Sequence, residues 1–118
     1  MGKHAKEFAD FRREMNERIL AEDNRVIKRI FSVDSLTYQD GALPAKTKEL
    51  LGLTASMVLR CDDCVAYHIS QCLETGSSRD EIMEALGVSL VVGGTIVIPH
   101  LRRAVAFLDE ITGAIPAK

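Results

Sequence analysis

The chain has 118 residues, a length that suits a single domain over residues 1–118. Hydrophobic residues make up 47% of it and aromatic residues only 5%, so a core must be built mainly from aliphatic side chains, which favours packed helices. A formal net charge of −2 without a basic, aromatic stripe argues against nucleic acid as a partner, and the longest uncharged run, residues 85–99, is too short to cross a bilayer, so we expect a soluble, cytoplasmic protein without membrane contact.

Two amphipathic helices are predicted in the first third of the chain. Over residues 5–20, apolar side chains recur at helical spacing between charged ones, which indicates an apolar and a solvated face. The apolar positions are Phe8, Phe11, Met15 and Ile19. A shorter helical pattern follows over about residues 24–31, and Asp40 with Gly41 marks the turn after it.

Three helices are predicted in the middle of the chain. A helix over about residues 44–59 begins with a proline, a residue that suits a first helical turn. The next helix should begin at Cys61 and stop near Gly76, because glycine accepts the left-handed conformation that ends helices. A capping box that begins at Ser78 opens a further helix, which Gly87 is expected to interrupt or end.

The segment 88–98 carries conflicting signals. Its valines and isoleucines favour a strand, and its two adjacent glycines count against a helix. A lone strand in an otherwise helical chain would have no partner for its backbone groups, so we predict a buried helix. Pro99 should kink or restart it, and a last amphipathic helix follows to about Ile111. The predicted fold is therefore all-α, a compact domain of about six helices.

The stretch that points to chemistry is a C-x-x-C pair, Cys61 and Cys64, followed by His68. At about 3.6 residues per turn the three side chains share one helix face, and the spacing of the two thiols allows a disulfide. The positive end of the helix dipole and a nearby imidazole both favour the thiolate, the reactive form of the thiol. Asp62 and Asp63 oppose them, so the sign of the net pKa shift of the thiols is left open.

The roles within the thiol pair depend on two competing effects. The dipole favours Cys61, which stands nearer the helix N-terminus. A direct proton acceptor can favour a thiolate more strongly than the dipole does, and His68 lies one turn from Cys64 but two turns from Cys61. We therefore predict that Cys64 attacks and that Cys61 resolves it in an intramolecular disulfide. Cys72 is expected at a buried apolar position and should stay reduced, with a third redox role as the alternative.

Metal binding is the other chemistry that these residues allow. Cys61, Cys64, His68 and Cys72 form a compact set of zinc-type ligands. Four ligands along one continuous helix cannot surround a tetrahedral ion, so we predict neither a metal nor a cofactor. His100, directly after a proline, is expected to be a helix-start residue, with a place in the site or at a subunit interface as the alternative.

With Glu49 added, the pattern becomes a glutamate, eleven residues, and then the C-x-x-C and the histidine. This arrangement resembles the carboxymuconolactone decarboxylase-like superfamily, specifically its alkylhydroperoxidase D-like branch. The similarity extends over most of the chain and includes the helix start at Glu49 and the stretch 91–103. The resemblance implies an all-helical fold and a homo-oligomer, a trimer or hexamer in which helices of neighbouring subunits cover one another.

The resemblance also implies roles for the four site residues. In the peroxidase branch, the residue matching Cys64 attacks the peroxide and the one matching Cys61 resolves it. Those matching Glu49 and His68 relay the proton. The resemblance thus implies a peroxide substrate and an external dithiol or lipoyl-type reductant. One position departs from the pattern, since those peroxidases carry a second histidine inside the C-x-x-C where this chain has Asp63. The departure bears on the efficiency and the reductant and leaves the thiol pair intact.

Two other functions are kept as alternatives. A decarboxylase acting on a lactone acid, which the superfamily name invites, would need cationic groups such as Arg102 or Arg103 and has no need of a dithiol. A non-catalytic, redox-regulated helical oligomer would form the disulfide without turning over any peroxide. Self-association is expected, because the segment 88–98 is apolar all round and a chain of this length has few layers with which to cover it.

Overall fold

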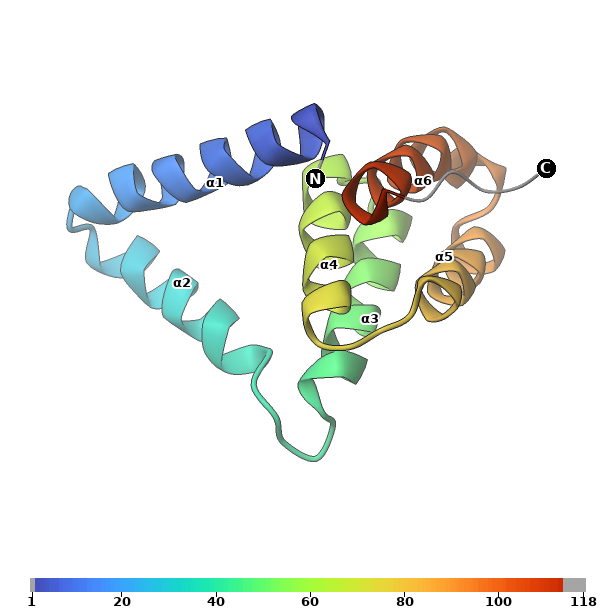
Figure 1. Cartoon of the computed structure of the whole chain (residues 1–118). Coiled ribbons are helices and arrows are strands. Elements are labelled where there is room, and N and C mark those ends of the chain that lie inside the picture. The colour runs from blue at the N-terminus through green and yellow to red at the C-terminus, as the bar shows by residue number, and fades with distance from the viewer. Residues whose placement is uncertain (1, 114–118) are drawn as a thin grey trace.

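The computed structural model describes residues 2–113, and within them the fold is all-α, as predicted. The helices are α1 (Lys3–Ala21), α2 (Arg25–Thr37), α3 (Ala45–Val58), α4 (Asp62–Glu74), α5 (Arg79–Gly93) and α6 (Ile98–Thr112), with a 3₁₀ turn, η1 (Thr95–Val97), before α6. Helices α3 to α6 pack into one body, whereas α1 and α2 form an arm whose tip lies away from that body (Figure 1). The arm and the α3–α4 pair outline an open triangle.

Local signals explain where most helices begin and end. The Asn24 side chain accepts hydrogen bonds from backbone N–H groups in the first turn of α2, and Ser78 and Glu81 form the predicted capping box at α5. Gly76, with a φ of 95°, follows the end of α4 as predicted. Pro44 is the N-cap of α3 rather than its first residue, because its ψ of 157° leaves it extended.

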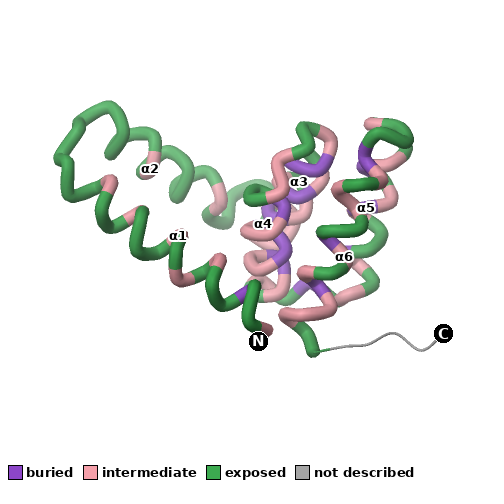
Figure 2. The backbone as a smooth tube through the Cα atoms, turned by 90° about the horizontal axis from the view of Figure 1, so that it is seen from above, coloured by how far each residue is buried: buried purple, intermediate pink, exposed green. Residues whose placement is uncertain are grey.

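The hydrophobic core lies among α3, α4, α5 and α6 (Figure 2). Its buried members are Leu53, Met57, Val65, Ile69, Cys72, Ile82, Leu86, Val97, Ala104 and Leu108. Burying one large aliphatic side chain stabilises a fold by about 1.5–3 kcal/mol, so this cluster is the main source of stability. The arm adds little to it, since Ala5 is the buried residue of α1 and α2 has none along its described length.

Helix α5 corrects the prediction that Gly87 interrupts or ends the helix begun at the capping box. The helix passes through Gly87 without a break, because Leu86 and Ser89 on either side of it are buried. That packing outweighs the cost of about 1 kcal/mol that a glycine imposes on a helix interior. The chain breaks instead at Gly94, where a φ of 83° suits glycine. Pro99 lies in the first turn of α6, so it restarts a helix as predicted.

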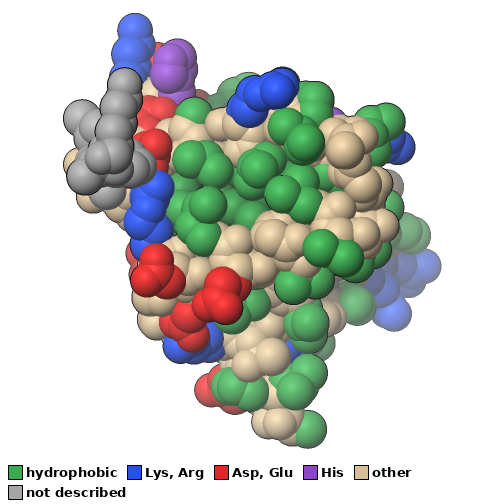
Figure 3. Space-filling view, turned by 90° about the vertical axis from the view of Figure 1, so that its right-hand side faces the viewer, with side chains coloured by type: hydrophobic (Ala, Val, Ile, Leu, Met, Phe, Trp, Pro, Cys, Tyr) green, Lys and Arg blue, Asp and Glu red, His purple; other side chains and the backbone are tan. Residues whose placement is uncertain are grey.

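The segment 88–98 is helical over most of its length, as predicted, but the prediction that it is buried is wrong for the single chain. Val91 is 88% exposed and Val92 68%, because only the other side of α5 packs on the body. With neighbouring side chains of α3, this part of α5 forms a hydrophobic surface, called here the α3/α5 face. It comprises Thr47, Leu50, Leu51, Thr54, Ala55, Val58, Leu59, Ala85, Val88 and Val92. Seen from the side of α5 and α6, hydrophobic side chains gather on this part of the molecule (Figure 3).

Helix α2 presents a second hydrophobic surface. It continues to Thr37, beyond the predicted end near residue 31, and its apolar residues recur at spacings of three and four. The exposed ones, called here the α2 stripe, are Val26, Ile27, Ile30, Val33 and Leu36. Among residues 2–113, no helix is both long and apolar enough to cross a membrane.

Candidate functional site

The two predicted cysteines lie at the start of α4 and form a disulfide, which confirms the predicted pairing. Their Cα atoms are 5.3 Å apart, as is usual for disulfides. Cys64 lies in the first turn, whereas Cys61 is the N-cap, outside the helix in which the sequence placed it. The chain reverses between α3 and α4, where Arg60 has a φ of 61° and Cys61 is extended. The Cys64 backbone N–H donates to Cys61 Sγ at 3.3 Å, so this sulfur caps the helix.

His68, one turn beyond Cys64, is held by a carboxylate from another helix. Its Nδ1 lies 2.8 Å from Glu49 Oε1, and because a carboxylate only accepts, the ring donates its N–H there. Both residues are buried, Glu49 at 3% exposed and His68 at 8%. Hydrogen bonds to charged groups are strong, particularly where water is excluded. Glu49, on α3, therefore sets the tautomer and the orientation of His68, and the structure brings these two predicted residues together.

The other ring nitrogen of His68 faces a residue that the sequence reasoning missed. Tyr38 Oη lies 3.5 Å from His68 Nε2, and the two ring centroids are 5.3 Å apart. Burial, reinforced by the charge of Glu49, raises the pKa of Tyr38, so its hydroxyl stays protonated and can donate. Tyr38 is the C-cap of α2 and lies 30 residues before His68, so no spacing rule links them. Gly52, on α3, leaves the room that both side chains occupy.

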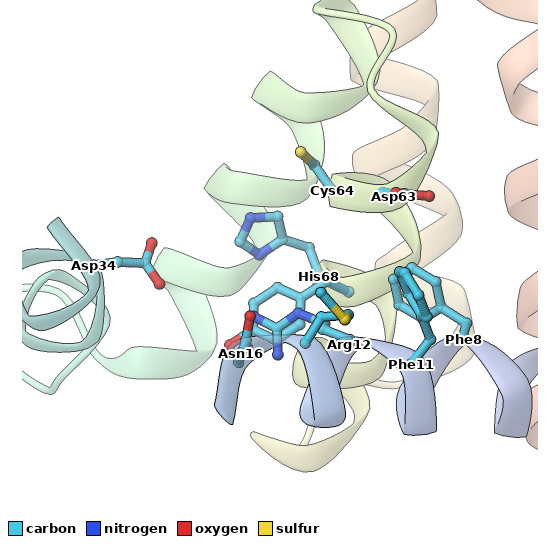
Figure 4. Close-up of a pocket in the computed structure, with 10 residues that line it drawn as sticks. Phe8, Phe11, Arg12, Asn16, Asp34, Asp63, Cys64 and His68 are labelled. Atoms are coloured by element: carbon cyan, nitrogen blue, oxygen red, sulfur yellow. The ribbon is translucent and has the colours of Figure 1, made fainter. Parts of the chain in front are cut away.

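A cavity of about 480 Å³ lies beside Cys64, between α4 and the arm (Figure 4). It is lined by Phe8, Phe11, Arg12, Met15, Asn16, Asp34, Asp63, Cys64, Tyr67 and His68. The Arg12 guanidinium lies 3.7 Å above the centre of the Tyr67 ring, which ties α1 to α4 across the cavity. Cys64 is exposed at this cavity, whereas Cys61, which the structure also describes, does not line it. The apolar face predicted for α1 thus serves as a cavity wall, which the sequence pattern did not indicate.

Cys72 lies apart from the dithiol. It is fully buried in the core, as predicted, and burial, with a contribution from the charge of Glu49, raises the pKa of its thiol to about 12. The zinc-type set of three cysteines and a histidine is therefore not assembled. Over the described range, 2–113, no three histidine, cysteine or acidic side chains are placed to hold a metal ion.

The first turn of α4 is also tied to α6. His100 Nδ1 donates to Asp62 Oδ1 at 2.8 Å, and Arg103 Nε donates to Asp62 Oδ2 at 2.7 Å. His100 is thus a helix-start residue, as predicted, in contact with the residue next to Cys61. Within the described chain, neither Arg103 nor Arg102, the cations named for a decarboxylase, lines the cavity beside the dithiol, whereas Arg12 does.

Comparison of the sequence with known families and proteins gives the following relatives. A sequence model described as the carboxymuconolactone decarboxylase family matches residues 25–107. An uncharacterized protein of Cupriavidus necator is 36% identical over 73 residues, and an uncharacterized protein of the cox locus of Paracoccus denitrificans is 31% identical over 83 residues. The alignments cover 62% and 70% of this chain and 65% and 75% of these relatives. The chain therefore spans just under two thirds of the Cupriavidus protein.

Solved structures share the fold. Two crystal structures of a Thermotoga maritima protein match with TM-scores of 0.88 and 0.86, at 56% and 54% identity. The matches cover 92% and 91% of this chain, and 95% and 91% of the Thermotoga chains. The second is described as a carboxymuconolactone decarboxylase family protein with a possible involvement in the antioxidative response. A protein of the same family from Legionella pneumophila matches with a TM-score of 0.69 at 26% identity, over 91% of this chain and 88% of its own.

Proposed function

The chain belongs to the carboxymuconolactone decarboxylase family, and on this premise we propose that it is a thiol-dependent oxidoreductase that reduces peroxides through a Cys61/Cys64 dithiol-disulfide cycle. One observation carries the proposal: Cys64, one half of the disulfide, is exposed at a cavity that His68 also lines, and Glu49 holds that histidine. A nucleophile, a proton acceptor and a group that orients the acceptor are thereby close together. The antioxidative description of the Thermotoga relative supports the same class of activity.

The proposed cycle begins with the reduced protein. The Cys64 thiolate attacks the terminal oxygen of the peroxide, the O–O bond breaks, and Cys64 becomes a sulfenic acid. His68 takes the thiol proton, directly or through one water, and returns it to the leaving alkoxide, which departs as an alcohol. Cys61 then attacks Cys64 Sγ, a disulfide forms, and the sulfenic oxygen leaves as water. The two thiols thus supply the two electrons that reduce the peroxide.

Two features of α4 support Cys64 as the attacking thiol. Cys64 is exposed and faces the cavity, whereas Cys61 is only partly exposed and caps the helix. His68, the proton acceptor on α4, lies one turn beyond Cys64, which outweighs the stabilisation that the N-terminus of α4 gives Cys61 Sγ through the Cys64 backbone N–H. Cys61 Sγ lies next to the Cys64 backbone N–H, so the resolving sulfur is within reach without a rearrangement of the chain.

The cavity favours an organic hydroperoxide as substrate. Its volume of about 480 Å³ falls within the usual range of small-molecule sites, about 300–1,000 Å³, and phenylalanine and methionine side chains of α1 form one wall. A hydrophobic body would be desolvated there while the peroxide group meets Cys64. For the reductant we propose an external dithiol or a lipoyl-type carrier, because disulfides are reduced by thiolate attack on an accessible sulfur and Cys64 is exposed.

Thiol counting tests the proposed function. The reduced protein is treated with one equivalent of an alkyl hydroperoxide, after which free thiols are counted and peptides are mapped without reduction. We expect a loss of two thiols per chain, an intrachain Cys61–Cys64 bridge and an unchanged Cys72, with continued peroxide consumption when a dithiol is supplied. A normal disulfide without peroxide turnover would instead indicate a non-catalytic, redox-regulated oligomer. Conversion of a lactone acid by protein that lacks both thiols would indicate a decarboxylase.

A homo-oligomer, a trimer or hexamer, is part of the proposal. The α2 stripe and the α3/α5 face are both hydrophobic, and residues 2–113 of the single chain leave both uncovered. The accessible surface of 7787 Å² exceeds the roughly 6,300 Å² expected of a folded monomer of 13.0 kDa. Contact between one face of a subunit and a different face of the next can close into a ring. Light scattering should give the mass of a trimer or a hexamer of the 13.0 kDa chain, and a monomer at micromolar concentration would contradict the proposed oligomer.

A further inference from the structure

The carboxylate of Asp62, which lies between the two cysteines in sequence, is held by two side chains of α6. His100 Nδ1 donates to its Oδ1 at 2.8 Å and Arg103 Nε donates to its Oδ2 at 2.7 Å. Asp62 is the first residue of α4, and its two partners stand 38 and 41 residues later, at the start of α6. The contact therefore ties the turn that carries the dithiol to a second helix of the body.

This contact changes the charge balance around the dithiol. Two acidic residues between the cysteines, Asp62 and Asp63, would by themselves disfavour a thiolate. Arg103 places a cation against Asp62, so that its charge is compensated. Burial favours the protonated form of Asp62, but the hydrogen bonds from His100 and Arg103 outweigh it and hold the pKa of this carboxyl below its usual value. Asp62 is therefore anionic and paired at neutral pH, whereas Asp63 is exposed at the cavity.

We propose that His100 and Arg103 are positioning residues of the dithiol, which hold Asp62, neutralise its charge and fix the first turn of α4 so that the Cys64 thiolate is favoured. This inference rests on the proposed function for its meaning in catalysis. A merely structural contact would predict no particular direction for the thiol pKa, whereas this proposal predicts one for each variant. Loss of Arg103 leaves an uncompensated anion near the thiol, whereas loss of the Asp62 charge leaves an uncompensated cation. The two changes should move the thiol in opposite directions.

Other charged or titratable groups also surround the dithiol. They include Asp63, His68 and Tyr67 on α4, Glu49 on α3, Arg12 on α1, Asp34 on α2, Tyr38 at the end of α2 and Arg60, which precedes Cys61 in the sequence. Each keeps its identity in the variants below. Differences between those variants therefore report the pairing of Asp62.

The test is a thiol titration in a Cys61→Ser background, in which Cys64 keeps no partner and Cys72 is silent because its pKa is about 12. Thiolate absorbance in the ultraviolet is followed against pH at low salt. Arg103→Gln should raise the pKa of Cys64 by about half a unit, and Asp62→Asn should lower it by a similar amount. The double variant should have a Cys64 pKa close to that of the parent protein. Arg103→Lys, which keeps the positive charge, should also leave the Cys64 pKa close to the parent value.

Arg102→Gln is the matched control. It removes the neighbouring cation of α6 but leaves Arg103, the arginine that binds Asp62, in place. If Arg103→Gln and Asp62→Asn shift the melting temperature but leave the thiol pKa where Arg102→Gln leaves it, the contact is only structural and the inference is wrong. Should Arg103→Gln not fold, Asp62→Asn and Arg103→Lys decide the same question. The titration needs no peroxide, so a protein that titrates as expected yet consumes no peroxide would refute the proposed function alone.

Discussion

Gly52 offers the sharpest test of the site, because a single methyl group there should displace His68. An added Cβ would lie 2.7 Å from His68 Cε1 and 2.8 Å from Tyr38 Oη. Ordinary contacts between carbon atoms lie at about 3.5–4.0 Å, so the imidazole must shift by roughly 1 Å. Such a shift separates Nδ1 from Glu49 Oε1, now 2.8 Å away, or turns the ring from the cavity that Cys64 lines.

Gly52→Ala should therefore reduce activity far more than stability. Alanine gains about 1 kcal/mol of helix propensity over glycine within α3, and overpacking costs about 1–3 kcal/mol, so the free energy of unfolding should fall by about 0–2 kcal/mol. A well-placed general base contributes about 10²–10⁴ to a rate, and a misplacement of about 1 Å can cost about 10²-fold. We expect sulfenic acid formation on Cys64 to slow by about 10- to 100-fold in a folded protein.

The assay traps the sulfenic acid on Cys64 with a dimedone-type reagent in a Cys61→Ser background, with rates from mass spectrometry and stability from urea unfolding. Gly87→Ala is the matched control within α5, since an added Cβ there meets nothing within 4 Å. The free energy of unfolding of this control should rise by about 0.5–1 kcal/mol, and its Cys64 should react at the parent rate. Adding Tyr38→Phe to Gly52→Ala removes one clash and should restore part of the lost rate. A Gly52→Ala protein that reacts at the parent rate would refute the role given to the imidazole.

The remaining predictions concern the thiols and the tyrosine near them. Peroxide should leave a trappable sulfenic acid on Cys64 in the Cys61→Ser variant and no sulfenic acid in the Cys64→Ser variant. If the Cys64→Ser protein instead reacts with peroxide at an undiminished rate through Cys61, the two roles are reversed. Cys72 should resist alkylation in the folded, reduced protein below about pH 11, because burial raises its pKa to about 12 and the thiol stays protonated. Mass spectrometry should find Cys72 labelled only after unfolding, and labelling of the native protein at about pH 8 would contradict that burial. Tyr38→Phe should change the rate of sulfenic acid formation by less than about threefold, because 3.5 Å is a long hydrogen bond to His68 Nε2. A tenfold loss in quenched-flow measurements would place the tyrosine on the proton path.

Local features were determined by the sequence alone. The three-residue spacing of Cys61 and Cys64 predicted their disulfide, because the distance between such neighbours depends on one turn of backbone. The capping box at Ser78 and the glycine at position 76 placed the boundaries of α4 and α5 for the same reason. The all-α fold followed from helical periodicity, and the family resemblance is confirmed by the match over residues 25–107.

Only the tertiary structure decided how these helices meet. Glu49 and His68 are 19 residues apart, and the resemblance, rather than their spacing, linked them before the structure brought them to 2.8 Å. Tyr38 and the α1 wall of the cavity had no sequence signal at all, because an amphipathic pattern marks which side of a helix is apolar and not what it will face.

The same limit explains the errors along α5 and the contact of Asp62 with α6. The lack of a partner strand correctly predicted a helix over most of the segment 88–98, and its composition made it apolar. Burial depends on which surface covers it, and residues 2–113 leave the α3/α5 face uncovered. Asp62 and Arg103 stand 41 residues apart and meet only because α4 and α6 pack together through the core. Periodicity within a helix is set by backbone geometry, whereas contacts between helices depend on how their side chains interdigitate, which no single segment of sequence contains.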